Sequence, residues 1–365
     1  MFSLRIPAAV ISTTIIASLA FLAFSPLVSF AADSSAMAKA SYLPDELMQL
    51  PHQFVIAKEW SGYWAGEDAP LVRCIQVNRP WTPTEDSNEI APEDLEPLEL
   101  LPGINLDLAS EGALLFYYLD GNGAWIRIGS SVHWYYGIKV SFVEASLMIV
   151  SAGMSGNLRA YQNIYAYRFK QDKAGAIALR DMTISIEDMP IVSTYQAYPH
   201  SELCYVAYPI MGVNWEGYGP FSHANSPDRY ILLAQNVDGT VANISANHED
   251  YYLKDINETS DYFKRQRASW VSYQREYRSF LPEIKDEAYM SYAVTLLIRY
   301  HDMGKHDEGI RLARQVIKPQ YFSSRERYRY AIRLVNETIA DLKMQDVLIK
   351  IAIDNYNSEL SAKYW

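Results

Sequence analysis

Three neighbouring pairs of ionisable side chains have the composition that acid–base catalysis requires. They are Glu67 with Asp68, Glu187 with Asp188, and His200 with Glu202. A hydrolase needs one group that donates a proton and another that accepts a proton or attacks the substrate, and such pairs can divide these tasks. Their spacing selects none of the three, so hydrolysis of a glycan by paired carboxylates is one of two hypotheses for function.

Aromatic residues are abundant, with 28 Tyr, 12 Phe and 8 Trp in the chain. Between positions 195 and 221 they alternate with Gly and Pro, which favour loops. Aromatic side chains on loops can stack on sugars or anchor a protein interface, although tyrosines also fill half-buried sheets. The candidate binding residues for a protein or glycan partner are Tyr198, Tyr205, Tyr208, Trp215, Tyr218 and Phe221.

The chain contains two cysteines, Cys74 and Cys204. Residues 1–31 have the pattern of a signal peptide, and an even number of cysteines in an exported protein favours a disulfide. The bond would close a loop of about 130 residues, which the chain-entropy description values at about 4 to 5 kcal/mol. We predict a Cys74–Cys204 disulfide, with two buried thiols as the alternative.

The segment His301-Asp302-Met303-Gly304-Lys305 resembles the H-D-x-G-K element of HD-type phosphohydrolases, which bind metals on a helical scaffold. Such a site needs further histidines, and no histidine follows His306 in the sequence. A turn between two helices explains Gly304 as well. We therefore predict no metal site and no other cofactor.

The first 31 residues have the pattern of a secretory signal peptide. Arg5 precedes an uncharged run from Ile6 to Ala32, and the small residues Ser29 and Ala31 occupy the positions that signal peptidase reads. We predict cleavage near Ala31, a periplasmic or secreted protein, and no membrane span once the signal is removed. An uncleaved anchor is the alternative, because the apolar run is long enough to span a bilayer.

Charge divides the remaining chain into two parts. From Ala32 to Asp255 there are 13 Lys and Arg against 28 Asp and Glu, whereas residues 256–365 contain 18 against 15. The acidic part repels phosphate groups, which argues against nucleic acid as a partner. The change predicts a polar lead-in over 32–51, a β domain over 52–255 and a helical domain over 256–365.

Hairpin signals recur in the acidic part. Asp120-Gly121-Asn122-Gly123 and Asp238-Gly239 separate runs of β-branched and aromatic residues, as tight hairpins require. Short strands at this spacing predict an antiparallel sandwich or barrel. Residues 80–102 carry five prolines and seven acidic residues without a basic one, which predicts a long surface loop.

After Asp255 the apolar spacing becomes helical. Phe263, Trp270 and Tyr277 lie on one stripe, which we expect to pack on the β domain with Trp270 buried. Further helices are expected from Pro282 to Met303, from Asp307 to Ile317, from Ser323 onward, and from Asp346 to Leu360.

Leu296, Tyr300 and Gly304, followed by the segment from Glu308 to Ala313, resemble one tetratricopeptide repeat. The resemblance covers about 30 residues and implies a pair of antiparallel helices, and no second copy follows at the expected period. An ordinary helical bundle is the alternative. The expected fold is therefore α+β: an N-terminal antiparallel all-β domain followed by a C-terminal helical domain of paired helices.

The leading hypothesis for function is an exported, non-catalytic envelope protein. It would act as a binding or assembly module that presents its β domain to a protein or glycan partner, and the glycan-acting hydrolase is the alternative. The triplets at Asn243, Asn257 and Asn336 would carry glycans only in a eukaryotic host.

Overall fold

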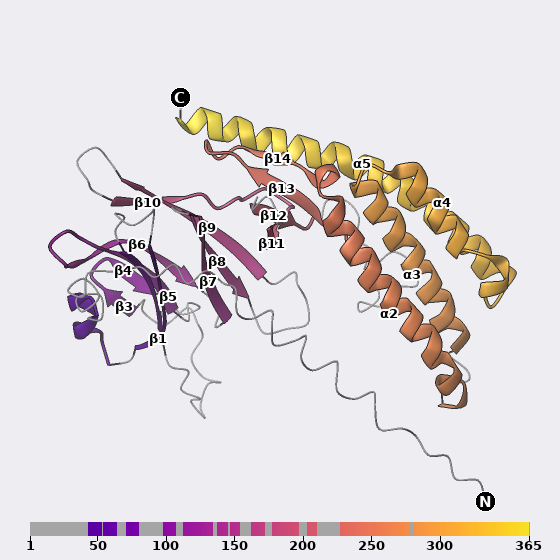
Figure 1. Cartoon of the computed structure of the whole chain (residues 1–365), viewed down its shortest axis with the longest axis horizontal. Coiled ribbons are helices and arrows are strands. Elements are labelled where there is room, and N and C mark those ends of the chain that lie inside the picture. The colour runs from indigo at the N-terminus through magenta and orange to yellow at the C-terminus, as the bar shows by residue number, and fades with distance from the viewer. Residues whose placement is uncertain are drawn as a thin grey trace, which may run out of the picture.

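The fold is α+β, with antiparallel sheets in the N-terminal part and the helices α2 to α5 in the C-terminal part (Figure 1). The predicted signal segment, most of the lead-in and most of the proline-rich loop lie outside the described residues. The structure, a computed structural model, describes residues 43–52, 54–63, 71–79, 98–106, 112–133, 137–144, 147–153, 162–171, 177–196, 203–209, 227–276 and 281–364.

Two four-stranded antiparallel sheets face each other as a β-sandwich. The first has the strand order β1-β2-β5-β6 and the second β10-β9-β8-β7. Alternate residues of a strand point to the same face, so Phe116 of the first sheet meets Met148 and Phe169 of the second in one buried cluster. The strands are β1 (Val55–Tyr63), β2 (Leu71–Asn78), β5 (Gly112–Leu119), β6 (Trp125–His133), β7 (Gly137–Glu144), β8 (Leu147–Gly153), β9 (Gln162–Gln171) and β10 (Ile177–Asp181).

The outer face of the first sheet is also covered. The short helix η1 (Asp45–Gln49) and the hairpin of β3 (Leu98–Leu101) with β4 (Ile104–Leu106) pack on it. Leu115 of β5 belongs to this outer cluster, whereas its neighbour Phe116 belongs to the inner one. Burial on both faces explains why β5 reads as a continuous apolar run.

A third antiparallel sheet lies between the sandwich and the helices. Its strands are β11 (Ile191–Gln196), β12 (Leu203–Ala207), β13 (Ile231–Gln235) and β14 (Val241–Asn243), in that order. On one face, Leu233 packs with Ile149 of the second sheet. On the other face, Leu232 packs with Tyr252 of α2. The β layers and the helices are therefore in direct contact through this sheet.

Both predicted hairpin turns are confirmed. Between β5 and β6, Asp120 Oδ1 accepts hydrogen bonds from the backbone N–H of Asn122 (3.0 Å) and Ala124 (2.7 Å). Between β13 and β14, Asp238 plays the same part toward Thr240 (2.9 Å), and Gly239 has a φ of 95°. A positive φ of this kind is strained for most other residues, which is why these turns need glycine.

The helical part consists of α2 (Glu249–Glu276), α3 (Leu281–Asp302), α4 (His306–Val316) and α5 (Arg325–Tyr364). Gly304 ends α3 with a φ of 74°, as expected of a C-cap glycine. Helix α4 packs close to α3 because Gly309 has no Cβ, which would lie 2.8 Å from the Cβ of Tyr300. Within the described part of the chain, none of the helices has both the length and the apolar character needed to cross a membrane.

The two helices expected from Ser323 onward and from Asp346 to Leu360 are one helix, α5. The serine at its start does cap it, because Ser324 Oγ accepts a hydrogen bond from the N–H of Arg327 at 3.1 Å. From Arg325 to Tyr364 the sequence contains no Gly or Pro that would end the helix. The first half of α5 packs on α3, and the second half extends across the third sheet (Figure 1).

The aromatic stripe of α2 is buried, but against a different surface from the one expected. Trp270 is 8% exposed and packs with Phe263 and with Tyr289 of α3. The first turns of α2, which carry Tyr252 and Ile256, are the part that faces the third sheet. The predicted stripe therefore joins two helices, and Tyr277 lies outside the described residues.

The predicted disulfide is wrong. Cys74 lies on β2 and is buried between the two sheets of the sandwich, whereas Cys204 lies on β12 and is buried between the third sheet and the helices. The second sheet separates the two sites. The Sγ of Cys204 instead contacts Nε2 of His248 at 3.5 Å. An even cysteine count carries no information on distance, which is what decides whether a bond forms.

Candidate functional site

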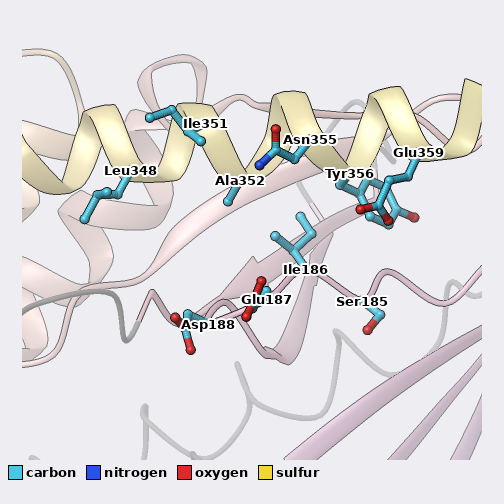
Figure 2. A pocket seen from close by; sticks show the side chains of 10 residues that line it. All are labelled: Ser185, Ile186, Glu187, Asp188, Leu348, Ile351, Ala352, Asn355, Tyr356 and Glu359. Carbon is cyan, nitrogen blue, oxygen red and sulfur yellow. The ribbon is translucent and has the colours of Figure 1, made fainter.

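A cleft of about 600 Å³ lies between the second half of α5 and the segment that joins β10 to β11. Figure 2 shows the two walls, with α5 on one side and residues 185–188 on the other. Ile186 points toward α5 and packs with Ala352 and Tyr356, so these three side chains form an apolar floor. The remaining lining residues are Ser185, Glu187, Asp188, Leu348, Ile351, Asn355 and Glu359.

The first wall is held in place by a few specific hydrogen bonds. As the chain leaves β10, the N–H of Met182 donates to the carbonyl of Ala166 at 2.8 Å, and the hydroxyl of Thr183 accepts from the N–H of Ala166 at 3.1 Å. A turn then closes between Ile186 and Met189, at 3.1 Å, with Asp188 at a φ of 55°. Aspartate is one of the residue types that tolerate this left-handed conformation.

The second wall, α5, is fixed to the third sheet by residues that neighbour its cleft-lining side chains. Ile349 and Ile353 are buried with side chains of the third sheet. Asn357 donates to the carbonyl of Val241 at 2.9 Å and accepts from its N–H at 2.8 Å. The cleft is therefore bounded by two walls that are each anchored to the β layers.

A buried polar network at the start of this half of α5 adds a second anchor. Arg229, just before β13, is 2% exposed. Its guanidinium donates to Asp302 Oδ1 of α3 at 2.8 and 3.0 Å, and to Gln345 Oε1 (2.9 Å) and Asp346 Oδ1 (2.6 Å) of α5. Burial opposes its charge, but Asp302 and Asp346 outweigh that effect and raise the pKa of Arg229 above its ordinary value.

Two histidines extend the network to the start of α4. His301 Nε2 lies 2.8 Å from Asp346 Oδ2, and its Nδ1 lies 2.8 Å from Nδ1 of His306. Burial opposes ionisation of Asp346, but the hydrogen bonds with His301 and Arg229 outweigh it and lower the pKa of that carboxyl. The His301-Asp302 pair of the H-D-x-G-K segment is thus engaged in joining α3, α5 and the third sheet.

The charged groups of the cleft have one sign. Glu187 and Asp188 on one wall and Glu359 on the other are exposed carboxylates. The described lining includes no Lys, Arg or His side chain. The cleft therefore presents hydrogen-bond acceptors and negative charge around an apolar floor.

An exposed apolar stripe on α5 runs beside the cleft. Met344, Val347 and Ile351 are 47%, 59% and 49% exposed. Their spacing of three and four residues places them along one side of the helix, and Ile351 also lines the cleft. Large apolar side chains that gather in this way mark interaction surfaces more often than single exposed ones do.

The structure places the sequence candidates in several locations. Of the three acid pairs, Glu187 and Asp188 line the cleft, and the other two pairs lie outside the described residues. Tyr205 is buried between the second and third sheets, and Tyr208 stacks at a tilt on Tyr230 with ring centroids 5.5 Å apart. Tyr198, Trp215, Tyr218 and Phe221 also lie outside the described residues, so the predicted aromatic surface stays a prediction.

Two parts of the site were missed by the sequence interpretation. The stripe of Met344, Val347 and Ile351 has helical spacing, but the same spacing marks a core face, and only the structure shows which face is buried. Arg229 gave no signal at all, because its partners lie 73 to 117 positions away in the sequence. Among the described residues, no three His, Cys, Asp or Glu side chains converge in a way that could hold a metal ion.

Comparisons with protein-family models, with curated proteins and with solved structures gave no match to this chain.

Proposed function

We propose that this chain is an exported, non-catalytic binding module, and that the cleft between α5 and residues 185–188 receives a segment of a partner protein in the cell envelope. The observation that carries the proposal is the continuity of the cleft with the exposed stripe of Met344, Val347 and Ile351. An apolar floor, the adjacent apolar stripe and a polar rim are the features of a protein interface. Export rests on the signal pattern of residues 1–31.

A hydrolase is the second candidate, because carboxylates from two different elements share one cleft. Glu187 and Asp188 lie on one wall and Glu359 lies on the other. A general acid works best when burial keeps its carboxyl protonated near neutral pH, and all three carboxylates are exposed. Their exposure favours binding over catalysis.

A variant that fills the cleft separates the two candidates. Ala352 lies on the floor, so Ala352→Trp would occupy the space between the walls. We expect the mature chain to migrate in a mild envelope extract as a complex larger than itself, and the Ala352→Trp variant to migrate as the isolated chain. Ile332→Trp, at an exposed position in the first half of the same helix, is the control and should keep the complex.

Glu359→Gln tests the alternative, because it removes the acid but nearly keeps the shape of the side chain. Loss of glycan cleavage in this variant, with the complex intact, would contradict the binding proposal. So would a chain that migrates alone whether or not the cleft is filled.

A further inference from the structure

From the charge and the spacing of this surface, we infer that the partner segment is an amphipathic helix with Lys or Arg along the side that lies over the cleft. The inference rests on the proposed function and specifies the secondary structure and charge of the partner segment. Two properties of the surface carry it: the straight apolar stripe on α5, and the carboxylates on one side of that stripe.

The stripe matches a helix in geometry. At 1.5 Å per residue, the distance along α5 from Met344 to Glu359 is about 22 Å, which corresponds to four turns of a partner helix. Side chains at positions i, i+3 and i+7, such as Met344, Val347 and Ile351, are the pattern by which one helix packs along another. An extended strand would need a row of unpaired backbone groups, and a helix surface offers none.

Charge determines which side of the partner is basic. Successive residues of a helix are 100° apart, so Lys350 and Ala352 lie on opposite sides of Ile351. The Ala352 side faces the cleft and includes Glu359, and Glu187 and Asp188 stand on the wall across from it. The other side carries both signs, with Lys350 and Asp354 exposed. Only the cleft side therefore selects one charge, and it selects a cation.

A second copy of this chain fits the surface less well. If two α5 helices paired antiparallel about a two-fold axis, the same flank of each would meet, because symmetric partners contribute the same residues. Neither flank brings a Lys, Arg or His of the described cleft lining to balance the carboxylates of the other, and like charges at an interface repel. A basic helix of another protein avoids this cost.

Designed peptides test the inference on the purified mature chain. The basic probe is a 21-residue helical peptide, about 31 Å long and so long enough to span that distance, with a leucine seam, lysines along one flank and glutamines elsewhere. The acidic probe has glutamates in place of the lysines, and the broken probe is the basic peptide with two central prolines. Fluorescence anisotropy at about 0.15 M salt should show the basic probe binding at least about tenfold more tightly than either of the others.

Charge-reversed variants show whether the binding is at the cleft. Reversal of Glu187, Asp188 and Glu359 to Lys should transfer the preference to the acidic probe. The matched control reverses three exposed acidic residues on α2 and α5, namely Glu258, Asp261 and Glu337. It changes the net charge by the same amount and should leave the preference for the basic probe unchanged.

The outcomes separate this inference from the proposal beneath it. Equal binding of the basic and broken probes, or the same loss of binding in both triple variants, would overturn the helix inference. If Ala352→Trp still dispersed the native complex in that case, the cleft would remain a binding site for a segment of another kind. Concentration-dependent dimerisation through α5 in the absence of any probe would assign the surface to a second copy and would also overturn the inference.

Discussion

Asn357 makes with its side-chain amide the two backbone hydrogen bonds that a neighbouring strand would make with Val241. The amide Oδ1 accepts from the N–H of Val241 at 2.8 Å, and Nδ2 donates to its carbonyl at 2.9 Å. Val241 lies on β14, the last strand of the third sheet. One residue of α5 thus closes part of a sheet edge that would otherwise offer its backbone groups to another chain.

Replacement of Asn357 should weaken the attachment of α5 to the third sheet. We expect Asn357→Ala to lower the free energy of unfolding by about 1 to 3 kcal/mol, because it leaves two backbone groups of β14 without their partners. Urea denaturation of the purified protein measures the change. Asn355→Ala, two residues away at an exposed position, is the control. Equal effects of the two substitutions would show that the Val241 contact contributes nothing specific.

The Arg229 network should be sensitive to the loss of one partner. Arg229→Met leaves the buried carboxylate of Asp302 uncompensated, and breaking a buried ion pair in this way costs about 3 to 5 kcal/mol. The double variant Arg229→Met/Asp302→Leu removes both charges and should recover a large part of that loss. Chemical denaturation tests both variants.

The exposed pair of Arg311 with Glu308 serves as the comparison for this network. Both side chains are about half exposed, and exposed ion pairs are worth about 0 to 1 kcal/mol. Arg311→Met should therefore have little effect on stability. A double variant of the buried pair that is no more stable than Arg229→Met would contradict the electrostatic explanation.

His306 should make the protein less stable in mild acid. Partial burial and the neighbouring His301 lower the pKa of His306 below its ordinary value of 6.5. The unfolded chain then binds a proton at a higher pH than the folded chain does. The stability that neutral His306 contributes to the folded state is complete above pH 6.5, and it is lost as the pH falls through the lower pKa that His306 has in the folded state.

The pH dependence can be measured as the difference in urea midpoint between pH 7.5 and pH 5. His306→Gln should reduce this difference, and His52→Gln, at an exposed position outside the network, should not. An unchanged difference in the His306 variant would show that another group is responsible. Asp346 contributes in a separate range, because its pKa is lowered from 3.8 and its stabilisation is lost only in stronger acid.

The two cysteines should both react with a thiol reagent once the unreduced protein is denatured. Cys74 and Cys204 are buried in different layers and are not joined. Burial also raises the pKa of the Cys74 thiol, so we expect slow labelling of this residue in the folded protein. Mass spectrometry counts the labels. A denatured, unreduced chain that takes up no label would show that Cys74 and Cys204 are joined by a disulfide.

Local signals in the sequence predicted the elements better than their arrangement. The glycines at 123, 239 and 304 mark turns by a conformation that few other residues adopt, so both hairpins and the end of α3 were found. The length of α5 was missed because polar residues near Asp346 interrupt its apolar pattern. They do so because Gln345 and Asp346 bind Arg229, a contact between residues more than 100 positions apart.

The same holds for the candidate site: its residue types were identified from the sequence, but their arrangement was not. The pair Glu187–Asp188 was identified from residue type alone, but nothing in the sequence placed it opposite Glu359. The aromatic stripe of α2 was identified from its spacing, but spacing does not show which surface covers the stripe. In the structure, Tyr289 of α3 covers it. Contacts between distant segments decide the site, and a single sequence does not reveal them.

We propose that a partner protein lies against the stripe and the cleft of α5. The most direct test places a photo-activated cross-linking amino acid at Val347 and, as a control, at Ile332, both exposed apolar positions of the same helix. After irradiation of intact cells, we predict one discrete protein adduct from Val347 and none from Ile332, with the adduct lost when Ala352→Trp fills the cleft. Adducts of equal yield from both positions, or none from either, would contradict the account.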